Sequence, residues 1–488
     1  IEDFAKEKFA IGSERNPEAS DAERRNLFEL ARRLRAENPK LDRTALFGAD
    51  VRKGFGRSAA IIIGNSLEIP LIGQKKGHQL EYRMGYLASE GDLIVICGKD
   101  CPSFERYQRK ILELTSLEYL KLGAATMRSA PGYCLRNKTA YKALSGYVRK
   151  NHGATFVSYL TTQATWALAS RLANDTQYQV FIAGPPGGLS DCANNKLWFA
   201  KVVEQALGAQ ATPPKRTAHG AAVLVRQVME LAKKWPKLVL KVPNSAGSAG
   251  NYVIYSKDTL GLSAFAVSIY LRARLRHLGW PERYPLAVEV WDENVLTSPS
   301  VQLWIPHQEN GDPMVEGVFE QVIVGEEGAF FGAAKAKLPS SVVVELCAQA
   351  FKLGLLLQNL GYYGRCSFDA VLYGPDIEHS KIHWIECNAR WGGVSIPMSF
   401  VKRSNANACY TITQAGGLQN PKRQFEDALI EFGDVLLPND RNRGIVFLNP
   451  NGVLNGTGCQ FLALGQTQFE TIVLSKQTYD RLCYKQIV

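Results

Sequence analysis

The chain has 488 residues, of which 46% are apolar, and carries a formal net charge of +11. This length and composition predict a globular protein of two or three domains and exclude a disordered or low-complexity chain. The longest apolar runs, such as SAAIIIG and DLIVIC, are too short to cross a bilayer, and IEDFAKEKFA does not resemble a secretory leader. The ten cysteines occur singly, with neither a CxxC pair nor zinc-site spacing. We therefore expect a soluble cytoplasmic protein with reduced thiols and no membrane partner.

The first part of the chain predicts a helical arm followed by alternating strands and helices. Residues 1–56 include DAERRNLFELARRLRAENPK, in which apolar residues recur at helical spacing between Arg and Glu. Residues 57–195 contain short apolar runs, each ending in Gly or polar residues and leading into a helical stretch, such as ATFVSYL before QATWALASRLA. This alternation predicts a parallel sheet covered by helices, with ligands bound beyond the carboxyl ends of the strands.

The second part predicts a mixture of helices and strands that ends in strands. Residues 196–420 begin with a helix closed by Gly208, continue with the helix AAVLVRQVMELAKKW and the strand KLVLKVP, and then become rich in strands. A further helix precedes two strands, RCSFDAVLYG and KIHWIECNAR. Residues 421–488 contain GIVFLNPNGVLNGTGCQFLALG, a pattern of strands and turns. We therefore predict an α/β chain with a β-rich C-terminal segment.

The stretch HWIECNAR places Glu386, Asn388 and Arg390 two residues apart, which puts them on one face of a strand. The preceding strand carries Asp369, which lies opposite Glu386 if the two strands form a hairpin that closes symmetrically about its turn. Two carboxylates and an amide oxygen then converge. Hard oxygen ligands of this kind suit magnesium ions that complete their shells with nucleotide phosphates. The alternative is a solvated polar face, which the neighbouring arginine and Gly392-Gly393 disfavour.

A second candidate site is LVLKVPNSAGSAGNYVI, where Lys241 ends an apolar strand and a loop of small residues runs from Ser245 to Asn251. Small residues let successive N–H groups fold over phosphate oxygens, and lysine supplies a compact positive charge. A simple flexible hairpin is the alternative. The loop is not a P-loop, because no GK[ST] follows and no helix begins there. In PLAVEVWDEN, Glu289 lies on a strand that suits adenine recognition, although an ordinary strand has the same pattern.

The order of these signals along the chain is more specific than any one of them. Lys196 at a helix start, Lys241 before a glycine-rich hairpin, Glu289, Asp369 and then ECNAR resemble the ATP-grasp superfamily over roughly residues 190–420. The N-terminal α/β part resembles the domain that usually precedes an ATP-grasp module. Within the superfamily, FIAGPPGGLSDCANNKLWFAKVV, LKVPNSAGSAGN and IECNARWGGVSIP are most similar to the stand-alone peptide ligases typified by the pheganomycin enzyme.

The resemblance implies a Rossmann-like pre-ATP-grasp domain over residues 57–195 and an ATP-grasp domain of two α+β subdomains over residues 196–420. The helical arm then occupies residues 1–56, and the β-rich C-terminal segment occupies residues 421–488.

The resemblance also implies roles for single residues. The residues expected to bind ATP are Lys196, Lys241, Ser245, Gly247, Ser248, Gly250 and Glu289. The expected magnesium ligands are Asp369, Glu386 and Asn388. Arg390 is expected to meet the transferring phosphate, whereas Arg365 either stabilises the developing oxyanion or forms a structural salt bridge.

One position departs from the superfamily pattern. Many members carry a ribose-binding Glu seven or eight residues after the adenine-reading Glu, where this chain has Leu296 and Thr297. Asp292 and Glu293 are the candidates that remain. His383 has no partner at metal-ligand spacing, so we expect it to be structural.

The reaction that the resemblance implies joins a small amino-acid-derived carboxylate to the N-terminal amine of a peptide. It proceeds through an acyl phosphate, gives ADP and phosphate, and is typical of natural-product biosynthesis. The alternative is an amino-acid ligase that makes a dipeptide or another small amide. The expected cofactors are ATP and Mg²⁺, and the expected partners are a carboxylic acid donor and a peptide acceptor.

The C-terminal strands could supply an edge along which an extended peptide lies. The candidate assembly is a homodimer, although the sequence does not fix the oligomeric state. A nucleic-acid-binding protein is disfavoured, because basic residues alternate with acidic ones and no aromatic stacking platform is present.

Overall fold

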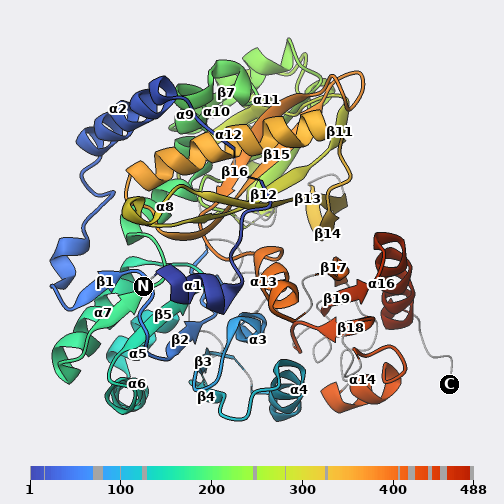
Figure 1. Cartoon of the computed structure of the whole chain (residues 1–488). Coiled ribbons are helices and arrows are strands. Elements are labelled where there is room, and N and C mark those ends of the chain that lie inside the picture. The colour runs from blue at the N-terminus through green and yellow to red at the C-terminus, as the bar shows by residue number, and fades with distance from the viewer. Residues whose placement is uncertain are drawn as a thin grey trace.

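The computed structural model describes residues 2–15, 17–69, 81–98, 100–123, 129–245, 250–277, 279–280, 282–324, 328–404, 407–415, 424–437, 442–450 and 459–483. The strands in these ranges form three sheets of six, four and nine strands. In Figure 1 the six-stranded sheet lies at the lower left, the four-stranded sheet lies at the top, and the last strands of the nine-stranded sheet lie at the lower right.

The first sheet is parallel throughout. Its strands are β1 (Val51–Lys53), β2 (Ala60–Ile63), β3 (Leu93–Ile96), β4 (Glu118–Lys121), β5 (Ala154–Ser158) and β6 (Val180–Ile182). Strands β2, β3 and β5 are buried along their whole length, as expected for a sheet covered on both faces. The order β1-β6-β5-β2-β3-β4 reverses direction between β2 and β5. Ligands of such sheets bind beyond the carboxyl ends of the strands at this reversal, so the residues that follow β2 and β5 are well placed for function.

Five helices of the described chain cover this sheet, and side chains of Ser129 and Asn137 cap the starts of two of them. The helices are α3 (Glu81–Met84), α4 (Pro102–Leu112), α5 (Ala130–Arg136), α6 (Lys138–Lys150) and α7 (Gln163–Thr176). Asn137 begins α6 by accepting a hydrogen bond from the backbone of Ala140 at 2.9 Å.

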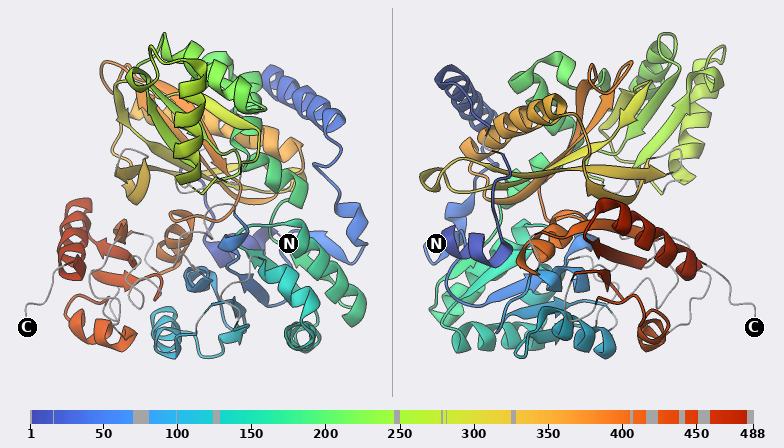
Figure 2. Two further views of the ribbon diagram at one scale, coloured as in Figure 1. Left: turned by 180° about the vertical axis from the view of Figure 1, so that it is seen from behind. Right: turned by 45° about the vertical axis from the view of Figure 1, so that its right-hand side comes forward.

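Two helices near the N-terminus precede the parallel sheet: α1 (Glu2–Phe9) and α2 (Asp21–Glu37). A capping box between Ser20 and Glu23 begins α2. The apolar face of α2 packs on α12 (Ser340–Asn359), and both helices lie on the outside of the nine-stranded sheet (Figure 2). Helix α12 is long and apolar enough to cross a membrane, but most of it is buried against β12 (Pro299–Ile305), β13 (Met314–Val324) and α2, which is the setting of a core helix.

The four-stranded sheet is antiparallel and has the order β7-β10-β8-β9. Its strands are β7 (Lys215–Ala218), β8 (Lys237–Lys241), β9 (Asn251–Tyr255) and β10 (Leu286–Val290). Helices α10 (Ala221–Ala232) and α11 (Ala264–His277) share one apolar cluster with these strands. This sheet therefore carries Lys241 at the end of β8 and Glu289 within β10.

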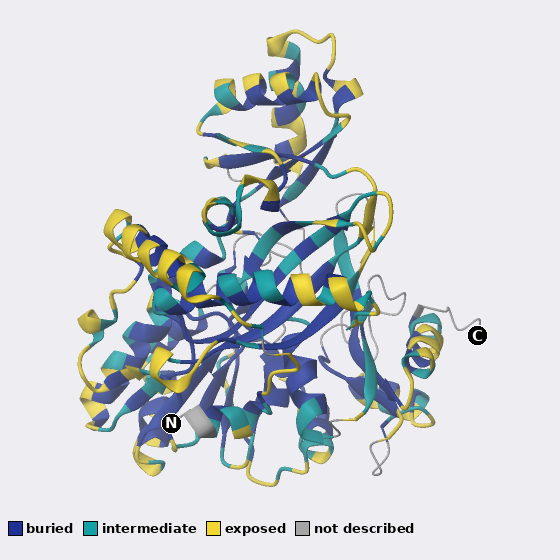
Figure 3. Cartoon of the chain, turned by 45° about the horizontal axis from the view of Figure 1, so that its top comes forward, coloured by how far each residue is buried: buried dark blue, intermediate teal, exposed yellow. Residues whose placement is uncertain are grey.

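The third sheet is antiparallel and unites the centre of the chain with its C-terminal part. Besides β12 and β13, it contains β11 (Val295–Thr297), β14 (Ala329–Lys335), β15 (Gly364–Tyr373), β16 (Lys381–Asn388), β17 (Cys409–Ala415), β18 (Gly444–Phe447) and β19 (Cys459–Gly465). Its order is β11-β15-β12-β13-β14-β17-β19-β18, and β16 pairs with β15. The remaining helices are α8 (Gly187–Ala193), α9 (Lys196–Leu207), α13 (Ser395–Ser404), α14 (Phe425–Glu431) and α16 (Gln468–Cys483). Figure 3 shows that the strands of this sheet are mostly buried, whereas the outer face of α2 is exposed.

The predicted α/β architecture is confirmed. A parallel sheet covered by helices comes first, two α+β subdomains follow, and the C-terminal strands complete an antiparallel sheet. The C-terminal segment also forms α14 (Phe425–Glu431) and α16 (Gln468–Cys483), which its pattern of strands and turns did not predict.

The expected open edge for a peptide is absent from the described backbone of strand β18. Its residue Ile445 accepts a hydrogen bond from Leu437 at 2.9 Å and donates one to Val435 at 2.7 Å. Phe447 donates its N–H to the Tyr107 hydroxyl at 3.0 Å. Because the chain itself uses these outward-facing groups, an extended peptide cannot pair with them.

Candidate active site

The hairpin of β15 and β16 carries the candidate metal ligands. Its register pairs Asp369 with Glu386, as the symmetric hairpin predicts. A bulge at Ile385 then shifts the register, so that Ala370 pairs with Trp384. The extra residue lets Trp384 point into the core, where it is completely buried, while Glu386 keeps 20% of its side chain exposed.

Asp369 lies at the centre of a small network of hydrogen bonds. Its carboxylate accepts from Ser300 Oγ at 2.6 Å and from Asn388 Nδ2 at 2.8 Å, and Gln302 donates to Ser300 at 2.9 Å. Burial, together with the charge of Glu386, raises the pKa of Asp369 to about 6. A cation beside this carboxylate would therefore remove an electrostatic cost that the unliganded site carries.

Glu386 is paired with the first of the two predicted lysines. Lys196 Nζ lies 2.7 Å from Glu386 Oε2 and also donates to the backbone oxygen of Ser245. Burial alone would raise the pKa of Glu386, but Lys196 outweighs burial and the net pKa is lowered. Lys196 is the first residue of α9, whose N-cap Asn195 accepts from the backbone of Trp198 at 3.1 Å. The start of α9 thus holds Lys196 between Ser245, in the loop after β8, and the carboxylate of Glu386.

Arg390 is held by two amide side chains. Its guanidinium donates to Asn388 Oδ1 and to Asn194 Oδ1, and Asn194 Oδ1 also accepts from the backbone of Ala389 at 3.1 Å. Asn194 therefore orients Arg390 from outside the strand. No sequence motif pointed to Asn194, although the polar pair before Lys196 in CANNK was a usable signal.

The second lysine lies on the four-stranded sheet. Lys241 forms an ion pair with Glu289, and both side chains are almost completely buried. Glu289 pairs in register with Val239, which places its side chain diagonal to Lys241 on the same face. Lys215, which no motif indicated, lies nearby with Nζ 3.5 Å from Glu204, and burial lowers its pKa. Lys215 on β7 and Lys241 on β8 thus flank Glu289, which lies on the strand between them.

The loop between β8 and β9 is described only at its two ends. Ser245 Oγ donates to the backbone oxygen of Val242 at 2.8 Å. A Cβ at Gly250 would clash with the side chain of Ser245, so a glycine is required there. Gly247 and Ser248 lie outside the described residues, and their contacts with phosphate stay predictions.

Arg365 takes part in a buried ion pair. Its guanidinium forms an ion pair with Glu316, and both side chains are almost completely buried. Lys402 Nζ lies 3.3 Å from the same carboxylate. The guanidinium carbon also lies 4.9 Å from the ring centroid of Trp391. Of the two roles that the sequence left open, we infer the structural salt bridge, because the arginine already has its counter-charge.

The ribose candidate Asp292 already has a partner. Its carboxylate lies 2.9 Å from Nδ1 of His383, whose Nε2 lies 3.1 Å from the Tyr373 hydroxyl. His383 therefore belongs to a side-chain network that its spacing in the sequence did not reveal. Glu293, the other candidate, is exposed.

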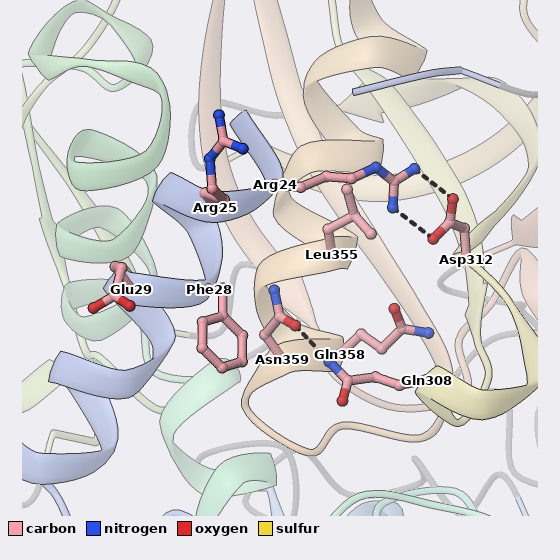
Figure 4. Close-up of a pocket in the computed structure, with 9 residues that line it drawn as sticks. All are labelled: Arg24, Arg25, Phe28, Glu29, Gln308, Asp312, Leu355, Gln358 and Asn359. Carbon is pink, nitrogen blue, oxygen red and sulfur yellow. Dashed lines mark hydrogen bonds and ion pairs between the residues drawn. The ribbon is translucent and has the colours of Figure 1, made fainter. Parts of the chain in front are cut away.

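Two cavities found among the described residues contain none of these groups. One, of about 470 Å³, lies between α2 and α12, where Arg24 pairs with Asp312 and Gln308 bonds Asn359 (Figure 4). The other, of about 480 Å³, includes Glu14. The described ranges also contain no group of three or more His, Cys, Asp or Glu that could hold a metal ion. The hairpin instead offers two carboxylates and an amide, which is a donor set that fits magnesium sharing its shell with phosphates.

Comparison with known proteins agrees with this geometry at the level of the fold. The Pre ATP-grasp domain family matches residues 81–173, and no curated protein matches the sequence. The structure is similar to N5-carboxyaminoimidazole ribonucleotide synthetase in complex with ADP (TM-score 0.55, 12% identity, 88% of this chain and 99% of that chain). It is also similar to biotin carboxylase from Campylobacter jejuni (TM-score 0.54, 13% identity, 88% and 92% covered).

A third similar structure is the biotin carboxylase domain of the Hydrogenobacter thermophilus 2-oxoglutarate carboxylase, with MgADP and bicarbonate. Its TM-score is 0.52 at 11% identity, with 86% of this chain and 90% of that chain covered. The chain therefore shares the fold of these enzymes, and its residues 81–173 match the pre ATP-grasp domain.

Proposed function

We propose that the chain is an ATP-dependent carboxylate–amine ligase that joins a small amino-acid-derived carboxylate to the N-terminal amine of a peptide. The observation that carries this proposal is the convergence of Lys196, Arg390 and Lys241 on the carboxylate of Glu386, which lies opposite Asp369 on the hairpin. This combination of cations and hard oxygen ligands is suited to a nucleoside triphosphate and its metal.

The chemistry explains why such a site is needed. A carboxylate does not acylate an amine in water, because the leaving group would be oxide. Transfer of the γ-phosphoryl group of ATP to the carboxylate oxygen gives an acyl phosphate and ADP. The amine then attacks the acyl carbon, phosphate leaves, and the amine loses a proton. The protein has to align the carboxylate with the γ-phosphorus and to balance charge on the phosphoryl oxygens.

Each charged group has a place in that scheme. Lys196 and Lys241 bind phosphate oxygens, and the loop that starts at Ser245 covers them. Arg390, oriented by Asn194, stabilises the negative charge that develops on the transferring phosphoryl group. We assign adenine recognition to the region of Glu289, which is ion-paired with Lys241.

Asp369, Glu386 and Asn388 would hold the magnesium ions. A magnesium ion held by these residues would neutralise negative charge on the phosphate oxygens. A bound cation would favour the ionised form of Asp369, whose pKa is raised in the unliganded site. It would also compete with Lys196 for Glu386, so we expect the metal and the lysine to share the charge of that carboxylate.

The peptide acceptor is supported by the similarity of three motifs to peptide ligases and by the surplus positive charge of the chain. The nucleotide needs only a few cations, whereas the net charge is +11, so a peptide with acidic groups would be steered toward the surface. An amino-acid ligase that makes a dipeptide has the same ATP chemistry and differs only in its acceptor.

The test compares three acceptors, each with ATP, Mg²⁺ and a panel of amino-acid donors. A peptide with a free amino end should gain one donor residue, and the same peptide N-acetylated should gain none. Single amino acids should react poorly, because they lack the remote binding energy that orients the amine. Equal use of single amino acids and peptides would favour the dipeptide-forming alternative.

A further inference from the structure

Arg83, in the short helix α3, is a buried cation that the ATP chemistry does not use. Only 3% of its surface is exposed. Among the described residues no carboxylate pairs with it, and its guanidinium donates to the neutral side chain of Gln460 at 3.0 Å. Its Nε has no hydrogen-bond partner in the described part of the chain. An unneutralised buried charge is costly, so a counter-ion from outside the chain is expected here.

Arg390 approaches the same place from the other side. The Arg83 guanidinium carbon lies 5.5 Å from the ring centroid of Tyr159. Burial alone would raise the pKa of the Tyr159 phenol, but the nearby Arg83 and Arg390 outweigh burial and lower it. Nε of Arg390 also has no partner among the described residues. The two guanidinium groups therefore both lie against the phenol of Tyr159, and no acidic side chain of the described chain pairs with Arg83.

The place of this cluster in the fold is that of a ligand site. Tyr159 directly follows β5, at the reversal of strand order between β2 and β5. Its carbonyl accepts from the backbone of Trp391 at 3.1 Å, which joins the end of the parallel sheet to the segment after β16. The hydroxyls of Ser158 and Ser190, on neighbouring segments, have no partner within the described ranges.

We infer that Arg83, Arg390 and Tyr159 form the binding site for the carboxylate that is activated, an inference that rests on the proposed function. A planar carboxylate accepts paired hydrogen bonds from guanidinium groups, and two such groups would neutralise it in this buried setting. Arg390 also contacts Asn388, so a carboxylate bound beside it lies next to the phosphate-binding groups, as phosphoryl transfer requires. Arg83 thereby selects the donor substrate, whereas the lysines bind the nucleotide.

Acetate and formate serve as minimal carboxylate probes, titrated in the presence of MgADP and followed by the shift in thermal unfolding midpoint. The wild-type protein should show saturable stabilisation by both anions. Arg83→Gln should weaken acetate binding at least tenfold, and Arg83→Lys should retain part of the affinity. Arg403→Gln is the matched control, because Arg403 is a half-buried arginine whose guanidinium donates to the backbone oxygen of Ala88. This control should bind acetate like the wild type.

A second titration separates a carboxylate site from a γ-phosphate site. Binding of the non-hydrolysable analogue MgAMPPNP, relative to MgADP, should not change in Arg83→Gln. A loss confined to MgAMPPNP would show that Arg83 binds the nucleotide and would overturn the inference. The inference would also be overturned if Arg83→Gln bound acetate as tightly as the wild type. It would fail equally if the wild type showed no saturable acetate binding. If Arg83→Gln does not fold, Arg83→Lys takes its place: its acetate affinity should be lower than that of the wild type, and wild-type acetate affinity in Arg83→Lys would overturn the inference. These titrations need no turnover, so they stand apart from a failure of every donor in the ligation assay.

Discussion

Lys196 and Glu386, which are far apart in the sequence, form an ion pair with 2.7 Å between Nζ and Oε2. Lys196 begins helix α9 and Glu386 lies on strand β16. The pair therefore links a candidate phosphate-binding residue directly to a candidate magnesium ligand. Each neutralises the other before substrate arrives. Binding of nucleotide and magnesium supplies both groups with new partners, and the residues are thus preorganised without an unpaired buried charge.

Glu386→Gln tests the metal assignment. The amide keeps the shape of the side chain but loses the charge that holds magnesium, so ADP formation should fall by about 100-fold or more. The free energy of unfolding should fall by up to about 3 kcal/mol, because Lys196, whose side chain is only 6% exposed, loses its counter-charge. Activity is measured by ADP release and stability by urea titration. Full activity in a folded variant would remove Glu386 from the metal site.

Lys196→Gln tests the phosphate assignment. The variant loses a cation at the base of the loop, so MgATP affinity measured by calorimetry should fall by about tenfold or more, which corresponds to about 1.4 kcal/mol. The matched control is Lys201→Gln on the same helix, where Lys201 makes an exposed pair with Glu37 at 3.0 Å. The control should bind MgATP normally. The assignment fails if the two variants bind MgATP equally well.

Asn194→Ala tests whether Asn194 positions Arg390. Loss of the acceptor frees the guanidinium, so kcat should fall by about tenfold to 100-fold while the KM for ATP stays nearly constant. Asn194→Asp keeps an oxygen for Arg390 and should restore much of kcat. Asn174→Ala, at an exposed position on α7, is the control. A rise in KM with unchanged kcat would assign Asn194 to nucleotide binding instead.

Glu81 should make the stability of the protein depend on pH. Burial raises its pKa from 4.5 to about 7, so the folded protein retains a proton that the unfolded chain releases. Stability from this group therefore decreases as pH rises from about 4.5 to 7, by on the order of 3 kcal/mol. Glu81→Gln removes the titration and should be more stable than the wild type at pH 8, with a smaller difference at pH 5. Denaturant unfolding of both proteins at pH 5 and pH 8 measures the free-energy difference. The same difference at the two pH values would contradict the prediction.

The local part of the site was predictable from the sequence, because strand periodicity and hairpin symmetry need only neighbouring residues. They place Asp369 opposite Glu386. The bulge at Ile385 was not predictable, since it depends on burying Trp384 in a core built by other elements.

Contacts between distant segments were equally hidden. The partner that makes Arg365 structural is Glu316 on strand β13, and the residue that orients Arg390 is Asn194 at the end of α8. The edge of β18 looked open because the segment that covers it, including Val435, carries no sequence signature of pairing.

The most direct test of the central claim is to identify the products of ATP cleavage. The protein is incubated with ATP, Mg²⁺, a panel of α-amino acids and their N-substituted derivatives, and hydroxylamine, which captures an activated acyl group as a hydroxamate. The account predicts a hydroxamate for the correct donor, formed together with equal amounts of ADP and phosphate. Formation of AMP and pyrophosphate with the hydroxamate would show that the carboxylate is adenylated and would contradict an acyl-phosphate mechanism.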